Sequence, residues 1–410
     1  MADKAATGTA VSASGERRQL HVAYGNALIA ARGYAAPETI EAFTRALESA
    51  AGETDTSDRF AAEYGLWAAS HTRGELPAMR AHAEAFLRGV SARPDSSEAC
   101  IAHRMAGSTH WFAGEYVEAR DCLERALTLL NPGRDDDLAF RFGQDPGIAA
   151  MVYLAIVLWP MGDVERAVSL VHDAEARISS LAHIGTQAYG IAHAAMFELM
   201  RGDHPRVAAN GLELARLARD RDLPTWRDYA VLFEGLANAE CSAPAGGLEG
   251  MRRGAELMRQ QNELVWDGLI KVALAEAEAR AGDVDRALAI LGEALATSER
   301  TGHRAFDAEL HRARGELLLK RDPTNPAPAE EALLRAIEIA KQQGTRSFRL
   351  RAALALAKLH QTTGRPTEAH AVLAPALESF SPTPEMPEIA EAQALLAALT
   401  ETEEVEAAIR

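Results

Sequence analysis

A turn glycine between two amphipathic helices recurs along this chain at nearly constant intervals. The glycines, with the equivalent positions of two further junctions, are Gly33, Gly74, Gly114, Gly162, Gly202, about Ala245, Gly282, about Ala327 and Gly364. Successive spacings are 41, 40, 48, 40, 43, 37, 45 and 37 residues, with a mean near 41. A fixed period in this range is the sequence signature of a helical solenoid, in which each unit buries its apolar face against its neighbours.

Residues 101–130 show one such unit in full. Small residues keep the first helix thin, and Gly114 ends it, because glycine takes the left-handed conformation at a helix C-terminus without a Cβ clash. An apolar face then recurs at three- and four-residue steps through Tyr116, Ala119, Leu123 and Ala126. This spacing of small and large residues resembles the tetratricopeptide repeat. We therefore predict an all-α, right-handed, tetratricopeptide-like solenoid of about nine helix hairpins with a C-terminal capping helix.

The chain divides by composition into three parts. Residues 1–15 are small and polar and are expected to form a disordered lead-in. Residues 16–384 contain the periodic units and are expected to form the superhelix. Residues 385–410 read as a capping helix followed by an acidic tail. Alanine-rich sequence with few β-branched runs favours helix throughout.

Charge and cysteine pattern limit the partners of the chain. It carries a formal net charge of −16, and such an acidic surface repels nucleic-acid phosphates and anionic membranes. We therefore expect no nucleic-acid or membrane partner. Three cysteines without metal spacing, and no apolar run of signal-peptide or membrane-spanning length, indicate a cytoplasmic protein.

Four stretches carry a more specific resemblance: Leu20–Glu38, Phe140–Ala150 (FRFGQDPGIAA), Val157–Ala167 (VLWPMGDVERA) and Arg300–Leu319 (RTGHRAFDAELHRARGELLL). They resemble the C-terminal tetratricopeptide-repeat region of bacterial fusions of a class III adenylate cyclase with a signal-transduction ATPase. That region is related to the sensor repeats of the maltose-regulon activator family. The resemblance implies a module that senses an input for a signalling enzyme. The chain lacks a cyclase core and a phosphate-binding loop, so the resemblance transfers no catalysis.

In the second of these stretches, Asp145 precedes Pro146 at the start of an apolar run. Aspartate caps free N–H groups, and proline fits the first helical turn. We expect Asp145 to cap a helix beginning near Pro146, and Phe140 or Phe142 to pack inward.

No motif for catalysis or metal binding stands out. The sequence contains no G-x-x-x-x-G-K-[ST], G-x-S-x-G or H-E-x-x-H pattern. The pairs His103/His110 and His303/His311 are explained by packing or surface positions at least as well as by ligation. We therefore expect no enzyme activity, no cofactor and no metal.

The inner surface gives the better indication of function. In tetratricopeptide arrays the first helix of each unit lines the concave side at fixed offsets before the turn glycine. These offsets place an aromatic and apolar set in units two to five: Tyr64, Arg104, Trp111, Trp159, Tyr189, Met196 and Met200. They place a charged set in units seven to nine: Glu276, Arg280, Glu309, Arg312, Glu316, Arg351 and Lys358. The alternative is that the aromatic residues belong to the core between repeats.

Two binding functions follow, with an enzyme as a third possibility that no motif supports. The first is a non-catalytic regulatory scaffold that binds a peptide or partner protein in the groove, and a signalling enzyme acting in trans is one such partner. The ligand-binding residues would be Tyr64, Arg104, Trp111, Trp159, Tyr189, Met196, Glu309, Arg312 and Arg351. The second is a small-molecule sensor at the aromatic end, where Trp111 and Trp159 would form an exposed platform beside Arg104.

Overall fold

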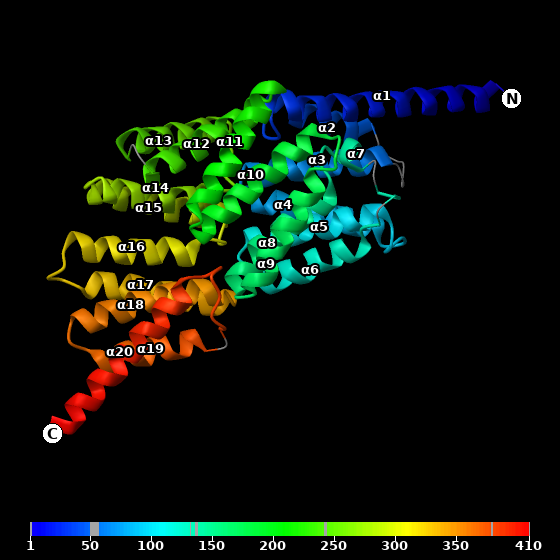
Figure 1. Cartoon of the computed structure of the whole chain (residues 1–410). Helices are drawn as coiled ribbons and strands as arrows, with labels where there is room; N and C mark the ends of the chain where they lie inside the picture. The colour runs from blue at the N-terminus through cyan, green and yellow to red at the C-terminus, as the bar shows by residue number, and fades with distance from the viewer. Residues whose placement is uncertain are drawn as a thin grey trace.

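The computed structural model describes the backbone of residues 2–49, 57–131, 133–135, 138–241, 244–378 and 380–409. Within these ranges the chain forms helices and turns and contains no strand (Figure 1). The first half comprises α1 (Ala2–Arg32), α2 (Pro37–Ser49), α3 (Ser57–Thr72), α4 (Leu76–Val90), α5 (Ser97–Phe112), α6 (Tyr116–Leu129), α7 (Leu138–Phe142), α8 (Pro146–Met161), α9 (Val164–Ile178), α10 (Ile184–Arg201) and α11 (His204–Asp220). The second half comprises α12 (Pro224–Cys241), α13 (Pro244–Gln260), α14 (Asp267–Arg280), α15 (Val284–Thr301), α16 (Asp307–Arg321), α17 (Ala327–Gln343), α18 (Arg346–Thr362), α19 (Pro366–Leu377) and α20 (Glu388–Ile409).

Consecutive helices pack as hairpins, which confirms the predicted tetratricopeptide-like solenoid with a capping helix. The nine hairpins of the described chain are α1/α2, α3/α4, α5/α6, α8/α9, α10/α11, α12/α13, α14/α15, α16/α17 and α18/α19. Helix α20 packs on α19 and α18 at the end of the array. The domain boundaries at residues 15 and 384 stay predictions.

The predicted turn glycines do end helices. Gly114, Gly162 and Gly202 have φ angles of 78°, 92° and 84°, in the left-handed region that disfavours other residues. At each site the next residue donates its N–H to a carbonyl one turn back, as in Asp163 N to Leu158 O at 3.0 Å. This pattern satisfies carbonyls that have no partner within the helix.

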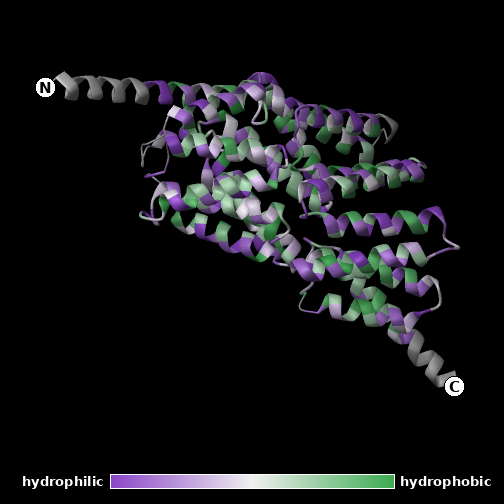
Figure 2. Cartoon of the chain, turned by 180° about the vertical axis from the view of Figure 1, so that it is seen from behind, coloured by the Kyte–Doolittle hydropathy of each residue, from purple (hydrophilic) through white to green (hydrophobic). Residues whose placement is uncertain are grey.

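The two helices of a hairpin differ in how they are buried. The second helix has one apolar stripe, as in α9, where Val164, Ala167, Val171 and Ala174 are buried. The first helix is buried nearly all round, and α8 is apolar along most of its length. Hydrophilic and hydrophobic residues accordingly alternate along the ribbons of most helices (Figure 2). First helices therefore line the inside of the array, and second helices cover the outside.

The array also folds back on itself, and the second half packs against the inner ends of the first (Figure 1). Backbone N–H groups before α14 and α16 donate to the last carbonyls of α3 and α5: Leu264 to Thr72 and Arg304 to Phe112, both at 2.8 Å. The Ser347 hydroxyl at the start of α18 donates to Trp159 O at 2.6 Å. Arg351 donates to Met200 O and Arg201 O, at 2.9 and 3.0 Å. We call this row of contacts the seam.

Aromatic side chains fill the space behind the seam. Trp111 lies 5.5 Å from Trp266 and 5.8 Å from Phe306, measured between ring centroids. Phe112 stacks on His303 at 3.9 Å. Because these rings come from opposite halves of the chain, the seam is an extension of the core as well as a row of hydrogen bonds.

The structure confirms the expectation for the segment before α8. Asp145 caps the helix, since its Oδ1 accepts from Ile148 N at 2.8 Å. Phe142 is buried and Phe140 is exposed. Asp145 also pairs with Arg177 at 2.7 Å, a contact that the sequence did not indicate.

In the part of the chain with described structure, no helix combines the length and the apolar character needed to cross a bilayer.

Removing one seam hydroxyl should measurably weaken the fold. The buried Tyr116 hydroxyl donates to Ala305 O at 2.8 Å, across 189 residues of sequence. Tyr116→Phe leaves that carbonyl unsatisfied, so we expect the free energy of unfolding to fall by about 1–2 kcal/mol in urea denaturation. Tyr24→Phe, at an exposed tyrosine, is the control. Equal stabilities of the two variants would argue against a stabilising seam.

Candidate functional site

A groove of about 380 Å³ lies on the C-terminal half. Helices α14, α16 and α18 form its walls, with the end of α10 and the start of α20. It contains all seven residues of the predicted charged set, namely Glu276, Arg280, Glu309, Arg312, Glu316, Arg351 and Lys358. We call it the charged groove. Its residues lie together, whereas their role in binding stays a prediction.

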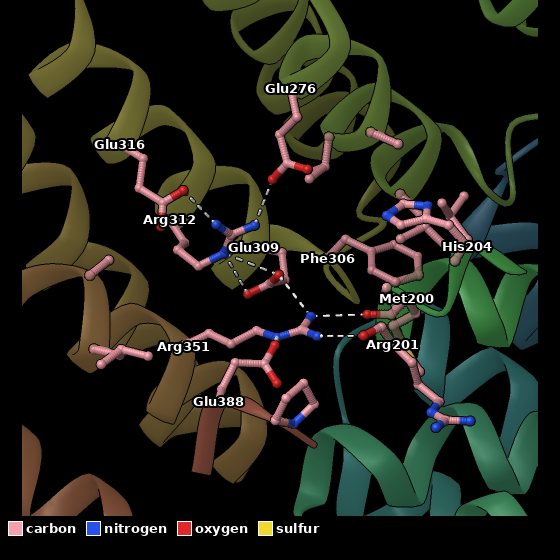
Figure 3. Close-up of a pocket in the computed structure, with 18 of the residues that line it drawn as sticks. Met200, Arg201, His204, Glu276, Phe306, Glu309, Arg312, Glu316, Arg351 and Glu388 are labelled. Atoms are coloured by element: carbon pink, nitrogen blue, oxygen red, sulfur yellow. Dashed lines mark hydrogen bonds and ion pairs between the residues drawn. The ribbon is translucent and has the colours of Figure 1, made fainter. Parts of the chain in front are cut away.

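Two arginines organise the charged groove (Figure 3). Arg312 contacts three carboxylates: Glu276 at 3.0 Å, Glu316 at 2.8 Å and Glu309 at 3.2 Å. Arg351 contacts Glu388 at 2.6 Å and Glu309 at 3.4 Å, and it also donates to the seam carbonyls of α10. Glu309 thus bridges both guanidinium groups. Burial opposes the charge of Arg312, yet the surrounding carboxylates hold its pKa well above the ordinary value, so it stays a cation.

The charge that the groove presents to solvent differs from the charge buried at the bottom of the groove. The side chains of Arg312, Arg351 and Glu309 are only 11%, 13% and 7% exposed. Those of Glu276 and Glu316 are 37% and 46% exposed. Two exposed cations also line the groove, Arg280 and Lys358, and Lys358 pairs with Glu391 at 2.7 Å. They are outnumbered by the accessible carboxylates of the lining, which are Glu276, Glu316, Glu388 and Glu391. The reachable surface of the groove is therefore predominantly anionic.

The aromatic set does not share this groove. Tyr64, Trp111, Trp159, Tyr189 and Met196 are buried, and the two tryptophans have no exposed surface. The expectation of an exposed platform formed by Trp111 and Trp159 is therefore wrong, because the seam covers both rings. From this set only Met200 lines the charged groove. Trp159 lies under its edge, 4.6 Å from the Arg351 guanidinium carbon.

Part of the aromatic set instead surrounds a second, smaller space of about 40 Å³, which residues from both halves of the chain line. We call it the aromatic cavity. Its lining includes Arg104, Tyr189 and residues that the offsets did not single out: Tyr34, Trp67, His71, Gln144, Tyr153, His193, Thr225, Trp226, Tyr229 and Glu263. Tyr64 contributes through its hydroxyl, which accepts from Arg104 at 3.2 Å. Arg104 therefore lies among aromatic rings, but these belong to Tyr64, Trp67 and Tyr153 and not to the predicted Trp111 and Trp159.

Burial dominates the electrostatics of the aromatic cavity. It raises the pKa of Glu263 to about 7, although the Tyr229 hydroxyl donates to this carboxylate at 3.1 Å. It lowers the pKa of His193 to about 3 and that of His71 well below its ordinary value. At neutral pH both imidazoles are therefore uncharged, and Arg104 carries the positive charge among the residues that line the aromatic cavity.

Sequence reasoning missed the residues that close the aromatic cavity and the seam. Trp226, Trp266, Phe306 and Phe348 lie near the starts of α12, α14, α16 and α18, at spacings of 40, 40 and 42 residues. A search for one bulky aromatic residue per unit near the start of each first helix would have found them. Glu263 and Glu388 have no comparable signal.

One group in the described ranges has the composition of a metal site: Glu330, His360 and Glu368. Arg365 already lies among them, 2.8 Å from Glu330 and 3.3 Å from Glu368. Its guanidinium supplies the positive charge that a cation would bring, so we interpret the group as an ion-pair cluster.

Comparisons with known proteins establish the fold. No protein-family model matches the chain. An uncharacterised protein of Rhizobium meliloti (strain 1021) is 26% identical over 253 residues, which make up 62% of this chain and 24% of that protein. The match thus spans about a quarter of the relative's length.

Among solved structures, a Rap protein complexed with competence and sporulation factor superposes with a TM-score of 0.52 at 12% identity, covering 85% of this chain and 99% of that one. A signal transduction ATPase with numerous domains and a tetratricopeptide repeat sensor, from Pyrococcus horikoshii, gives a TM-score of 0.44 at 12% identity, over 90% of this chain and 50% of that one. The chain is a tetratricopeptide-like helical-repeat protein.

Replacing Glu263 by glutamine should remove a pH-dependent penalty. A glutamate in the unfolded chain has a pKa of about 4.5, which is lower than the pKa of about 7 of Glu263 in the folded state. The folded state therefore binds this proton more tightly. Stability therefore falls as pH rises from about 4.5 to about 7, and the loss is complete above that range. Between about pH 4.5 and 8, the free energy of unfolding of the Glu263→Gln variant should therefore rise by about 3 kcal/mol relative to that of the wild type.

Urea unfolding at several pH values measures this difference. Glu249→Gln, which removes an exposed carboxylate, controls for the change in charge. Parallel pH profiles for wild type and Glu263→Gln would contradict the assignment.

Proposed function

We propose that this protein is a non-catalytic recognition scaffold that binds a peptide segment or a segment of a partner protein in the charged groove. The observation that carries the proposal is the division of charge within the groove. Arg312 and Arg351 are buried and already paired, whereas the more accessible charged side chains of the lining, Arg280 and Lys358 apart, are carboxylates. A groove of about 380 Å³ lies within the range of sites that hold small ligands or a few anchoring side chains.

The same division indicates the charge of the occupant. An acidic segment would have to compete with Glu276, Glu309 and Glu316 for Arg312. A segment bearing lysine or arginine would meet the exposed oxygens of Glu276 and Glu316 without breaking the network below. The net charge of −16 adds long-range attraction for such a partner.

The biological setting that we propose is signalling. The sequence stretches that resemble the repeat region of adenylate cyclase and ATPase fusions suggest a sensor for a linked enzyme or for one acting in trans. The Rhizobium meliloti relative is about four times longer than the matched region, which is consistent with such repeats occurring beside other domains. Binding of a cationic segment in the groove would be the sensed input.

A small-molecule sensor is the second candidate function. Of the residues that suggested it, Arg104 and Tyr189 line the aromatic cavity, so such a ligand would bind apart from the charged groove. An occupant of the groove depends on Glu276 and Glu316, whereas a ligand of the cavity depends on Arg104. Enzyme activity stays the third possibility, without a residue set to support it.

Neutralising the exposed groove carboxylates should weaken binding of cationic peptides. Two labelled libraries of short peptides serve as probes, one with lysine at fixed positions and one with glutamate. We expect the double variant Glu276→Gln/Glu316→Gln to bind the lysine library about tenfold more weakly than wild type in fluorescence anisotropy, because two direct charge contacts are lost.

The matched control is Glu84→Gln/Glu249→Gln, which removes the same charge from exposed carboxylates that also pair with an arginine on their own helix. It should leave the affinity for lysine peptides nearly unchanged. Equal losses in both variants would show that net charge alone drives binding. Preferential binding of the glutamate library would reverse the proposed charge of the occupant.

A further inference from the structure

The aromatic cavity contains a buried cation that is held only by neutral groups. Arg104 is 2% exposed, and its two terminal nitrogens donate to the hydroxyls of Tyr64 at 3.2 Å and Tyr189 at 2.9 Å. Its guanidinium carbon lies 4.7 Å from the ring centroid of Trp67 and 5.5 Å from that of Tyr153. Phenol hydroxyls and aromatic faces stabilise a cation only in part, and arginine does not lose its proton in proteins.

Other arginines with comparably buried side chains have carboxylate partners. Arg201, with a side chain 7% exposed, pairs with Glu198 at 2.8 Å and also with Glu385. Arg312 and Arg351 contact several glutamates each in the charged groove. For Arg104 no ion pair is found within the described ranges of the chain. A buried charge without a counter-charge is strongly unfavourable, so this position calls for an anion.

Unpartnered polar atoms gather at the same cavity. Arg104 Nε, Thr225 Oγ1 and Gln144 Oε1 are buried and have no hydrogen-bond partner among the described residues. All three residues line the cavity, and each is at most 5% exposed. The first two atoms are donors suited to an anion, and the third is an acceptor suited to a water beside it.

From this convergence we propose that the aromatic cavity binds one small monovalent anion, a halide or a short carboxylate, on Arg104 and Thr225. The cavity volume of about 40 Å³ has room for roughly three water-sized groups, which fits such an ion with a water. The half-buried Tyr34, in the turn after α1, lies on the side towards solvent. This site is separate from the charged groove, so it does not depend on peptide binding there.

Glu263 lines the same cavity and sets the conditions of the test. Among the described residues no ion pair joins its carboxylate to Arg104; the carboxylate accepts from Tyr229, whereas Arg104 donates to Tyr64 and Tyr189. Burial raises the pKa of Glu263 to about 7, so at about pH 6 this carboxyl is mostly protonated and does not repel an anion. The neighbouring His71 and His193 are uncharged at that pH because burial lowers the pKa of each.

The test measures melting temperature and tryptophan fluorescence at about pH 6, while chloride, bromide, formate or acetate replaces gluconate at constant ionic strength. Gluconate is too large for the cavity. We expect a saturable rise in melting temperature with each small anion. We also expect bromide to quench fluorescence saturably, because Trp67 and Trp226 line the site.

Variants at two positions separate a site from a general salt effect. Thr225→Val should weaken anion affinity about tenfold, whereas Thr225→Ser, which keeps the hydroxyl, should bind like wild type. Arg104→Met should lose the response altogether, and in gluconate it should melt no lower than wild type, since it removes an uncompensated charge. If Arg104→Met does not fold, the two Thr225 variants decide the matter. Identical melting curves of the wild type in all anions, or equal responses of Thr225→Val and Thr225→Ser, would overturn the proposal.

Discussion

The seam is the interaction on which the rest of the structure depends. The first helices of units two to five end with backbone carbonyls that accept hydrogen bonds from the starts of later units. Arg351 does more than donate to such carbonyls, because its positive charge lies at the negative end of the α10 dipole. Through these contacts the aromatic side chains of the first half are buried against the second half.

Local features of the fold could be predicted from the sequence because they depend on a few neighbouring residues. A glycine such as Gly162 ends a helix through its own backbone conformation, and Asp145 caps one through a side chain three residues away. The placement of Arg312 and Arg351 in one groove followed from the repeat offset, since adjacent units stack in register. These inferences required only the periodicity of the chain.

The burial of the tryptophans could not be inferred in that way. Whether Trp111 faces an open hollow depends on how far the superhelix rotates over five units, which is a sum of many small angles between helices. The chain does contain a signal for closure, in Trp266, Phe306 and Phe348 near the starts of successive first helices. This signal becomes informative only when it is known which helix ends of the two halves contact one another. Arg104, by contrast, contacts Trp67 of the preceding unit, which is a local packing choice between α3 and α5.

The seam also changes how a chain of this kind can reach its native state. Repeat arrays ordinarily grow by adding each unit to the one before, so their contacts are local. Here Tyr116 and Ala305 are 189 residues apart, and Trp159 and Ser347 are 188 apart. Such high contact order delays closure until the second half has been synthesised, and until then the aromatic inner surface of the first half lacks its cover. Closure then converts a string of nearly independent hairpins into one cooperative unit.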